Sequence, residues 1–182
     1  MTDKSQFVRR RHGEENNPDC IVSTVKHPSY VMVWSVINFR GTGRLQVVQG
    51  TLKQEQYKNI LEDHLLPQLS EWFPHEEKPI FMQDGAPSHK ARMITKFLED
   101  KNIDILDWPG NSPDMNPIEN VWEVMKREVS KSAITTKEKL LEKLNDVWHH
   151  NTHLQEVVKT CAESMPRRIA AVIAAKGGHT KY

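Results

Sequence analysis

The order of apolar patterns along the chain is the feature that most limits its fold. From residue 31 onward, short β-branched apolar runs alternate with longer segments of helical periodicity, and beyond residue 117 the segments are helical only. A strand pair, then strands alternating with helices, then helices alone, predict a mixed α/β sheet covered by helices. Ligands in such folds collect beyond the carboxyl ends of strands, so a site is expected in the loops that follow strands.

The first ordered segments predict an antiparallel hairpin. Residues 31–37 form a nearly continuous apolar run, which favours a strand buried on both faces. A short polar patch with Gly41 and Gly43 follows, and strand character resumes over residues 45–48.

The remaining elements follow from apolar spacing and from proline and glycine. Thr51 is expected to cap a helix whose apolar residues, from Tyr57 to Leu69, share one face and which ends near Pro74. We further expect a strand over 79–83, a helix over 91–98, a strand over 103–108, a helix from Pro117 that buries Val121, Met125 and Val129, a helix from Leu140 to Trp148, and two helical segments that end at 174–178.

Composition excludes several classes of protein. A chain of 182 residues with 37% hydrophobic residues suits one domain with a core of modest size. No run approaches 18 apolar residues and no signal peptide opens the chain, so we expect neither secretion nor a membrane partner. With 25 Lys+Arg against 24 Asp+Glu, only local basic patches are left for an anionic partner. Residues 1–30 are polar and turn-rich and predict a loop or an extended arm.

Three acidic residues are candidates for metal chemistry. Asp84 follows a predicted strand, Glu119 begins a predicted helix, and Asp3 lies at the amino terminus. Carboxylates that converge on one point bind Mg²⁺ well, because this hard cation prefers oxygen ligands. A pair of such ions can activate the attacking oxygen and stabilise the leaving oxygen of a phosphodiester.

Each of these acids also has a simpler interpretation. Asp84 and the glycine after it are a common turn pair. Glu119 comes three residues after Asn116, with Pro117 at the first helical position, which predicts a capping box. Asp3 is by position an exposed terminal residue. The residue patterns alone leave both interpretations open, and the two roles can coexist.

Two longer motifs carry a resemblance to a known family. Residues 83–89 read Gln-Asp-Gly-Ala-Pro-Ser-His, and residues 108–122 read Trp-Pro-Gly-Asn-Ser-Pro-Asp-Met-Asn-Pro-Ile-Glu-Asn-Val-Trp. Together they resemble the catalytic domain of the Tc/mariner superfamily of DDE transposases, specifically its Tc-like branch. Residues 31–34, 164–168 and 177–182 are similar to other parts of the family pattern, so the likeness covers nearly the whole chain.

The resemblance implies a ribonuclease-H-like fold with an Asp, Asp, Glu triad that holds two Mg²⁺ ions, with Mn²⁺ as a substitute. Asp84 would be the second acid and Glu119 the third, and the 34 residues between them match the Tc-like branch. Residues 2–7 resemble the motif of the family's first strand, with Lys4 in place of an acid, so Asp3 is the candidate for the first acid.

The family pattern also suggests that the first-strand region is incomplete. Phe7 continues directly into an arginine-rich segment, whereas the family has a further hairpin's worth of chain between them. We therefore expect a polar arm with a remnant of the first strand over residues 1–30 and a DDE transposase catalytic domain over residues 31–182.

By this resemblance the chain would cleave DNA strands and transfer them during transposition and integration, with activity impaired by truncation. The family's amino-terminal DNA-binding modules have no counterpart here, so binding to transposon ends and target DNA is expected to be non-specific and to use phosphate contacts. A nuclear location and a possible homodimer follow from the resemblance only. The candidate DNA contacts are Arg9, Arg10, Arg11, Lys126, Arg127, Lys131, Arg167 and Arg168.

Alternatives from other classes stay open. The chain could be a non-catalytic remnant or a domesticated module that binds nucleic acid or a protein partner. His89 could orient a metal-bound water, or it could only pack at the start of a helix. The spacing of His149, His150 and His153 could bring two imidazoles together, which is a weak indication of zinc.

Overall fold

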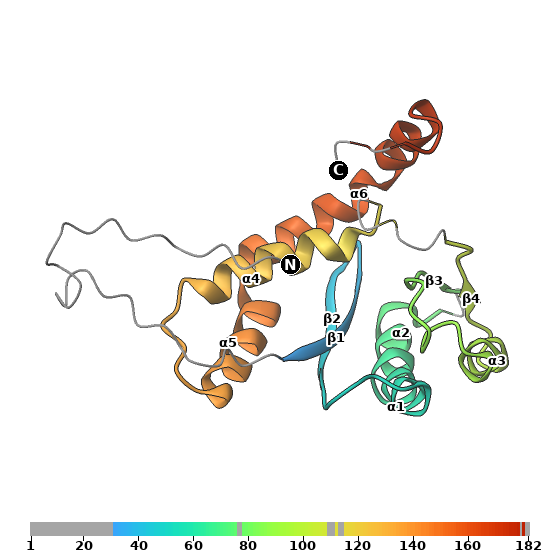
Figure 1. The fold of residues 1–182 in the computed structure, drawn as a ribbon. Coiled ribbons are helices and arrows are strands. Elements are labelled where there is room, and N and C mark those ends of the chain that lie inside the picture. Colours follow the sequence, from blue (N-terminus) through green and yellow to red (C-terminus); the bar gives the residue numbers. More distant parts are fainter. Residues whose placement is uncertain (1–30, 76–77, 109–111, 113–114, 179, 181–182) are drawn as a thin grey trace, which may run out of the picture. The chain divides into compact units, whose positions relative to one another are not determined.

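The computed structural model of the chain describes residues 31–182, except 76–77, 109–111, 113–114, 179 and 181–182. The arm predicted over residues 1–30 lies outside the described residues, together with Asp3 and the arginines at 9–11, so the boundary after residue 30 stays a prediction. In chain order the elements are β1 (Met32–Asn38), β2 (Gly41–Val48), α1 (Gln54–Ile60), the π-helical turn η2 (Leu61–Leu65), α2 (Leu66–Trp72), β3 (Ile80–Phe81), α3 (Arg92–Asp100), β4 (Asp104–Ile105), α4 (Pro117–Ser130), α5 (Lys137–His150) and α6 (Thr152–Ala174) (Figure 1).

Strands β1 and β2 form the predicted antiparallel hairpin. Trp34 lies opposite Gln46, and the register shifts between Ser35 and Ile37. The second strand begins at Gly41, earlier than expected, because two residues suffice for the turn. Gly41 adopts a φ of +134°, which residues other than glycine rarely adopt.

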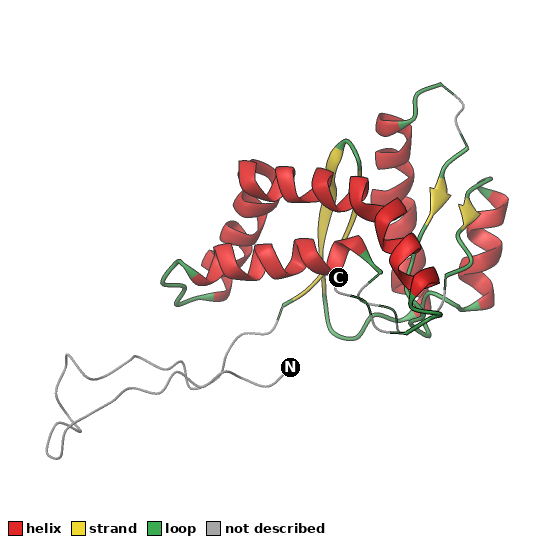
Figure 2. Cartoon of the chain, turned by 90° about the horizontal axis from the view of Figure 1, so that it is seen from above, coloured by secondary structure: helices red, strands yellow, loops and turns green. Residues whose placement is uncertain are grey.

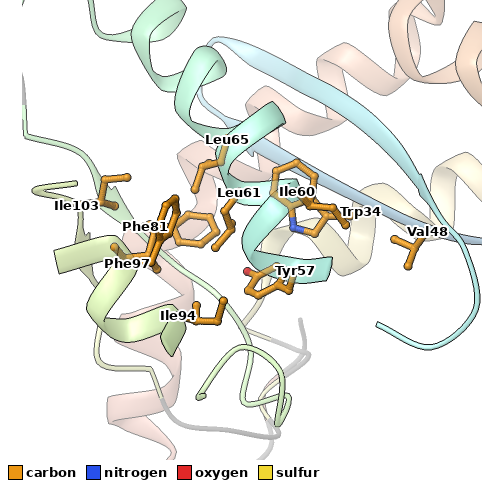
Figure 3. Close-up of a cluster of buried hydrophobic side chains, with 11 residues drawn as sticks. Trp34, Val48, Tyr57, Ile60, Leu61, Leu65, Phe81, Ile94, Phe97 and Ile103 are labelled. Carbon is orange, nitrogen blue, oxygen red and sulfur yellow. The ribbon is translucent and has the colours of Figure 1, made fainter. Parts of the chain in front are cut away.

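The hairpin has an apolar cluster on each face. Trp34 and Val48 belong to a first cluster with α1, η2, α3 and β3, whereas Ile37 and Leu45 pack against a second cluster formed by α4, α5 and α6. Figure 3 shows the first cluster. Because successive strand residues point to opposite faces, the apolar run of β1 serves both clusters. Trp34 and Ser35 confirm the prediction of burial on both faces, although Met32 at the strand's start is 47% exposed.

The helical stretch after the hairpin has three parts, α1, η2 and α2. Its apolar face is buried as predicted, with Tyr57, Leu61 and Leu65 in the first cluster. The turn η2 is followed by Leu66 and Pro67, and the missing N–H of Pro67 interrupts the regular hydrogen-bond ladder at this point. The predicted cap at Thr51 is wrong: α1 begins after Lys53, which makes no side-chain capping bond.

Strands β3 and β4 form a second, parallel pair, with Ile80 opposite Asp104 and Phe81 opposite Ile105. Each is shorter than the runs predicted over 79–83 and 103–108. The single mixed sheet that we expected is therefore not seen within the described residues, where β1 pairs with β2 only and β3 with β4 only. Residues of β1 and β3 line a common cavity instead of pairing. The mixed α/β class is confirmed, with its sheet in two pieces.

The carboxyl-terminal part is helical, as predicted. Helices α4 and α6 lie side by side (Figure 2). One helix, α6, replaces the two predicted segments and contains Pro166 without ending there. It ends beyond Ala174, where the N–H of Gly177 donates to the carbonyl of Val172 at 3.0 Å and Gly177 has a φ of +81°. Among the described helices, none combines the length and the apolar content that a membrane span requires.

Candidate active site

One cavity of about 360 Å³ brings together segments that are distant in the sequence. It is lined by all seven residues of β1, by residues 79–84 around β3, and by the start of α4. Asp84, His89 and Glu119 are among its lining residues. Two of the three acids that the sequence singled out, with 34 residues between them, therefore lie on one cavity.

Asp84 lies beyond the carboxyl end of β3, where the sequence predicted it. Its Oδ1 accepts a hydrogen bond from the N–H of Ala86 at 3.0 Å, so the turn interpretation is confirmed. The same Oδ1 lies 2.6 Å from Nδ1 of His89. Both contacts use one oxygen and the side chain is 59% exposed, so the turn role leaves room for a ligand role.

His89 is held against α1 and is only 15% exposed. Its ring stacks on Tyr57, with 4.1 Å between ring centroids. The hydroxyl of Tyr57 donates to Oε1 of Gln83 at 2.8 Å, and Nε2 of Gln83 donates to the backbone carbonyl of His89 at 3.2 Å. Gln83 therefore ties the two ends of the Asp84 loop to each other and to α1.

Tyr57 is buried, with 1% of its surface exposed. Burial raises the pKa of its hydroxyl, and the negative charge of Asp84 adds to the rise, while a hydrogen bond with Trp34 offsets part of it. The hydroxyl therefore stays protonated and remains a donor to Gln83. Sequence reasoning treated Tyr57 only as an apolar helix position and missed this polar role. The one available signal was that Gln83 opens the motif at residues 83–89.

Glu119 is positioned by the start of α4. Asn116 caps this helix, its Oδ1 accepting from the N–H of Ile118 at 3.3 Å, and Pro117 occupies the first turn as predicted. The predicted capping box is only half formed, since in the described part of the chain the Asn116 N–H makes no return bond to the Glu119 carboxylate. The exposed carboxylate stays at the cavity, near the positive end of the helix dipole.

The candidate DNA contacts on the helices differ in their exposure to solvent. Lys126, Arg127, Lys131 and Arg167 are exposed, and Lys131 also forms an ion pair with Glu128 at 2.7 Å.

Arg168 contradicts its prediction as a DNA contact. Its side chain is buried, with 4% exposed, so the guanidinium is not available to a phosphate. Its Nε donates to Oγ of Ser164 at 2.8 Å and its Nη2 donates to Oδ1 of Asn120 at 2.7 Å. Arg168 thus joins α6 to the first turns of α4.

The zinc hypothesis receives no support from the described residues, among which no group of three or more His, Cys, Asp or Glu side chains could hold a metal. His150 instead lies 3.6 Å from Asp146 on its own helix. Of the predicted triad, Asp84 and Glu119 share the cavity, and Asp3 lies outside the described residues.

Comparisons with known sequences agree with the resemblance. A family profile described as DDE superfamily endonuclease matches residues 2–142. The Tcb1 transposase of Caenorhabditis briggsae is 34% identical over 184 residues, and the Tc1 transposase of Caenorhabditis elegans is 32% identical over 184 residues. Each alignment covers 100% of this chain and 65% of the relative, so the chain spans 65% of the length of these relatives.

Solved structures share the fold. The catalytic domain of the Mos1 mariner transposase matches with a TM-score of 0.77 and 20% identity, over 87% of this chain and 80% of that one. Mos1 in a paired-end complex with Mn matches with a TM-score of 0.76 and 21% identity, over 96% of this chain and 54% of that one. At such identities the likeness concerns the fold alone, and it confirms the predicted ribonuclease-H-like class.

Proposed function

Because the chain belongs to the DDE superfamily of endonucleases, we propose that it is the catalytic domain of a Tc-type DNA transposase, which cuts DNA strands and joins them to target DNA. The observation that carries this proposal is that Asp84 and Glu119, with 34 residues between them, line one cavity. The similarity to the Tcb1 and Tc1 transposases, at 34% and 32% identity, supports the same activity.

A divalent metal is the proposed cofactor. The donor set suits a hard cation, since Asp84 and Glu119 offer exposed carboxylate oxygens at the cavity. These two residues would hold the metal, with Asp3 as the proposed third ligand. Mos1 has been solved with Mg and with Mn, which supports Mg²⁺ as the cofactor and Mn²⁺ as its substitute. When bound, such ions activate an attacking oxygen and stabilise the leaving oxygen of a phosphodiester.

Other residues of the chain hold the two proposed metal ligands in place. The turn bond from Ala86 holds one oxygen of Asp84, and the capped start of α4 holds the backbone of Glu119. Ligands held in advance bind a metal with better geometry than ligands on a mobile chain, because less conformational freedom is lost on binding.

DNA is the proposed substrate and partner. Mos1 has been solved as a paired-end complex with the left transposon end, which supports this substrate class. The exposed cations Lys126, Arg127, Lys131 and Arg167 are the described candidates for phosphate contacts. Binding through phosphates would weaken steeply as salt is added. A nuclear location and a homodimer are part of the proposal through the resemblance only.

Metal-dependent nicking of a supercoiled plasmid tests the proposal. We expect nicking by the wild-type chain with Mg²⁺ or Mn²⁺, none with EDTA, and background levels for Asp84→Asn and Glu119→Gln. Two exposed acids serve as matched controls: Asp100 at the end of α3 and Glu123 one turn beyond Glu119. The Asp100→Asn and Glu123→Gln variants should nick the plasmid like the wild type.

Two outcomes would reject the enzymatic proposal. Equal plasmid nicking by the wild type and Asp84→Asn would show that the cleavage comes from a contaminant. Salt-sensitive DNA binding by every variant, with no cleavage by any, would instead favour a non-catalytic nucleic-acid-binding module.

A further inference from the structure

The largely buried imidazole of His89 lies next to the carboxylate of Asp84, one of the two acids at the cavity. Nδ1 of His89 lies 2.6 Å from Oδ1 of Asp84. Within the described residues this nitrogen is buried and satisfies no hydrogen-bond geometry, so the Asp84 carboxylate is the polar group that it faces. The contact is thus a close polar approach between a ring nitrogen and a carboxylate oxygen, at the separation of a hydrogen bond.

We propose that His89 is a positioning residue, whose Nδ1 holds Oδ1 of Asp84 and leaves Oδ2 for a divalent metal. This inference rests on the proposed function, because the orientation of the carboxylate matters only if Asp84 binds a metal. Partners that orient metal ligands commonly contribute tenfold or more to metal affinity.

The imidazole has a fixed support. Its ring stacks on Tyr57 at 4.1 Å with an interplanar angle of 29°, and its backbone carbonyl accepts from Gln83. Tyr57 belongs to the first cluster, where Figure 3 draws it together with Trp34 and Ile94. A ring that packs on a buried side chain has few alternative rotamers, so it can hold a carboxylate that is itself 59% exposed.

A purely structural role for His89 predicts a different response to substitution. Asparagine carries its amide nitrogen at the same distance along the side chain as Nδ1, whereas glutamine carries it near the position of Nε2. Glutamine is also closer to histidine in volume. If His89 only fills space beside Tyr57, His89→Gln should be the milder change; if Nδ1 positions Asp84, His89→Asn should be the milder change.

The experiment measures Mn²⁺ affinity by electron paramagnetic resonance for the whole chain, with Asp84→Asn as the control for the site. We expect His89→Asn to stay within about threefold of the wild type and His89→Gln to lose about tenfold or more, which is the range for partners that orient metal ligands. Thermal melting of each variant establishes that it is folded. Equal affinities for the two variants, or a weaker His89→Asn, would overturn the inference.

A second measurement needs no metal and no variant of His89. Nitrogen NMR of the wild type should show a proton on Nδ1 of His89, and Asp84→Asn should shift that nitrogen's signal. An Nδ1 without a proton would reject the contact whatever the metal affinity. If instead Asp84→Asn binds Mn²⁺ as tightly as the wild type, the proposed function fails, and the NMR result decides separately whether His89 holds Asp84.

Discussion

The two acids of the candidate site are supported by different means. Asp84 lies in a loop and is held by a turn bond from Ala86 and by the approach of His89. Glu119 belongs to the first turn of α4, a helix whose apolar face is buried in the second cluster. A loop position depends on a few polar contacts of about 1 kcal/mol each, whereas a packed helix depends on much apolar area. Substitutions that loosen the Asp84 loop should therefore leave the chain folded, whereas substitutions that disrupt the packing of α4 around Glu119 should unfold it.

Removing the Trp148 side chain should give the largest loss of stability, because Trp148 belongs to the second cluster, which supports α4 and Glu119. Trp148 is fully buried, stacks on Trp122 at 4.9 Å, and donates its indole N–H to the carbonyl of Gly43 at 2.7 Å. Trp148→Ala should lower the free energy of unfolding in urea by about 3–5 kcal/mol, through a cavity in the second cluster. Trp148→Phe, which keeps a ring, should lose clearly less. A loss below about 1 kcal/mol for the alanine variant would show that α4 does not depend on this cluster.

Tyr57→Phe tests the polar support of the Asp84 side. The change keeps the ring that stacks on His89 but leaves Oε1 of Gln83 without its donor. Because an unsatisfied partly buried acceptor is costly, the free energy of unfolding should fall by about 1–2 kcal/mol, as measured in urea. An unchanged stability would mean that the Tyr57–Gln83 bond does not hold the loop.

Asn116→Ala tests the cap on the Glu119 side. It removes the bond from Asn116 Oδ1 to the N–H of Ile118 and should cost about 1 kcal/mol in the free energy of unfolding. Asn116→Ser, which restores a capping oxygen, should recover most of the loss. If both variants unfold like the wild type, the start of α4 is set by packing and Pro117 alone.

High pH should lower the stability of the chain through Tyr57, which supports the Asp84 loop. The folded-state pKa of Tyr57 is raised by burial, so its contribution to stability is fully present below the ordinary tyrosine pKa and is lost as the pH rises above about 10. Between pH 10 and pH 11 the wild type should lose up to about 1 kcal/mol more than Tyr57→Phe in urea unfolding. Parallel losses in the two proteins would contradict the burial of a neutral hydroxyl.

Local patterns predicted much of the fold and failed at identifiable points. The hairpin, the strand before Asp84 and the cap at Asn116 follow from short-range rules and are confirmed. Thr51 is a good capping residue by type, but the helix begins three residues beyond it, at Gln54. The two helical segments expected at the carboxyl end are one helix, α6, which continues through Pro166.

Arg168 shows why a basic pair cannot be assigned to DNA from its charge. One of its partners, Ser164, lies one turn away and was visible in the sequence, but the other, Asn120, lies 48 residues away. Helical spacing places Arg168, but not the exposed Arg167, on the same face as the buried Val158 and Cys161. Charge alone does not separate the two arginines, and only the packing of α6 on α4 supplies Asn120 as a buried partner.

By itself the sequence determined the element types, the identity of the candidate acids and the family, because these depend on residue types at short spacings and on motifs that can be read in order. Only the tertiary structure decided that Asp84 and Glu119 share one cavity and that Tyr57 supports His89. These contacts join segments tens of residues apart, and they form because two separate apolar clusters bring a loop and a helix start to the same place.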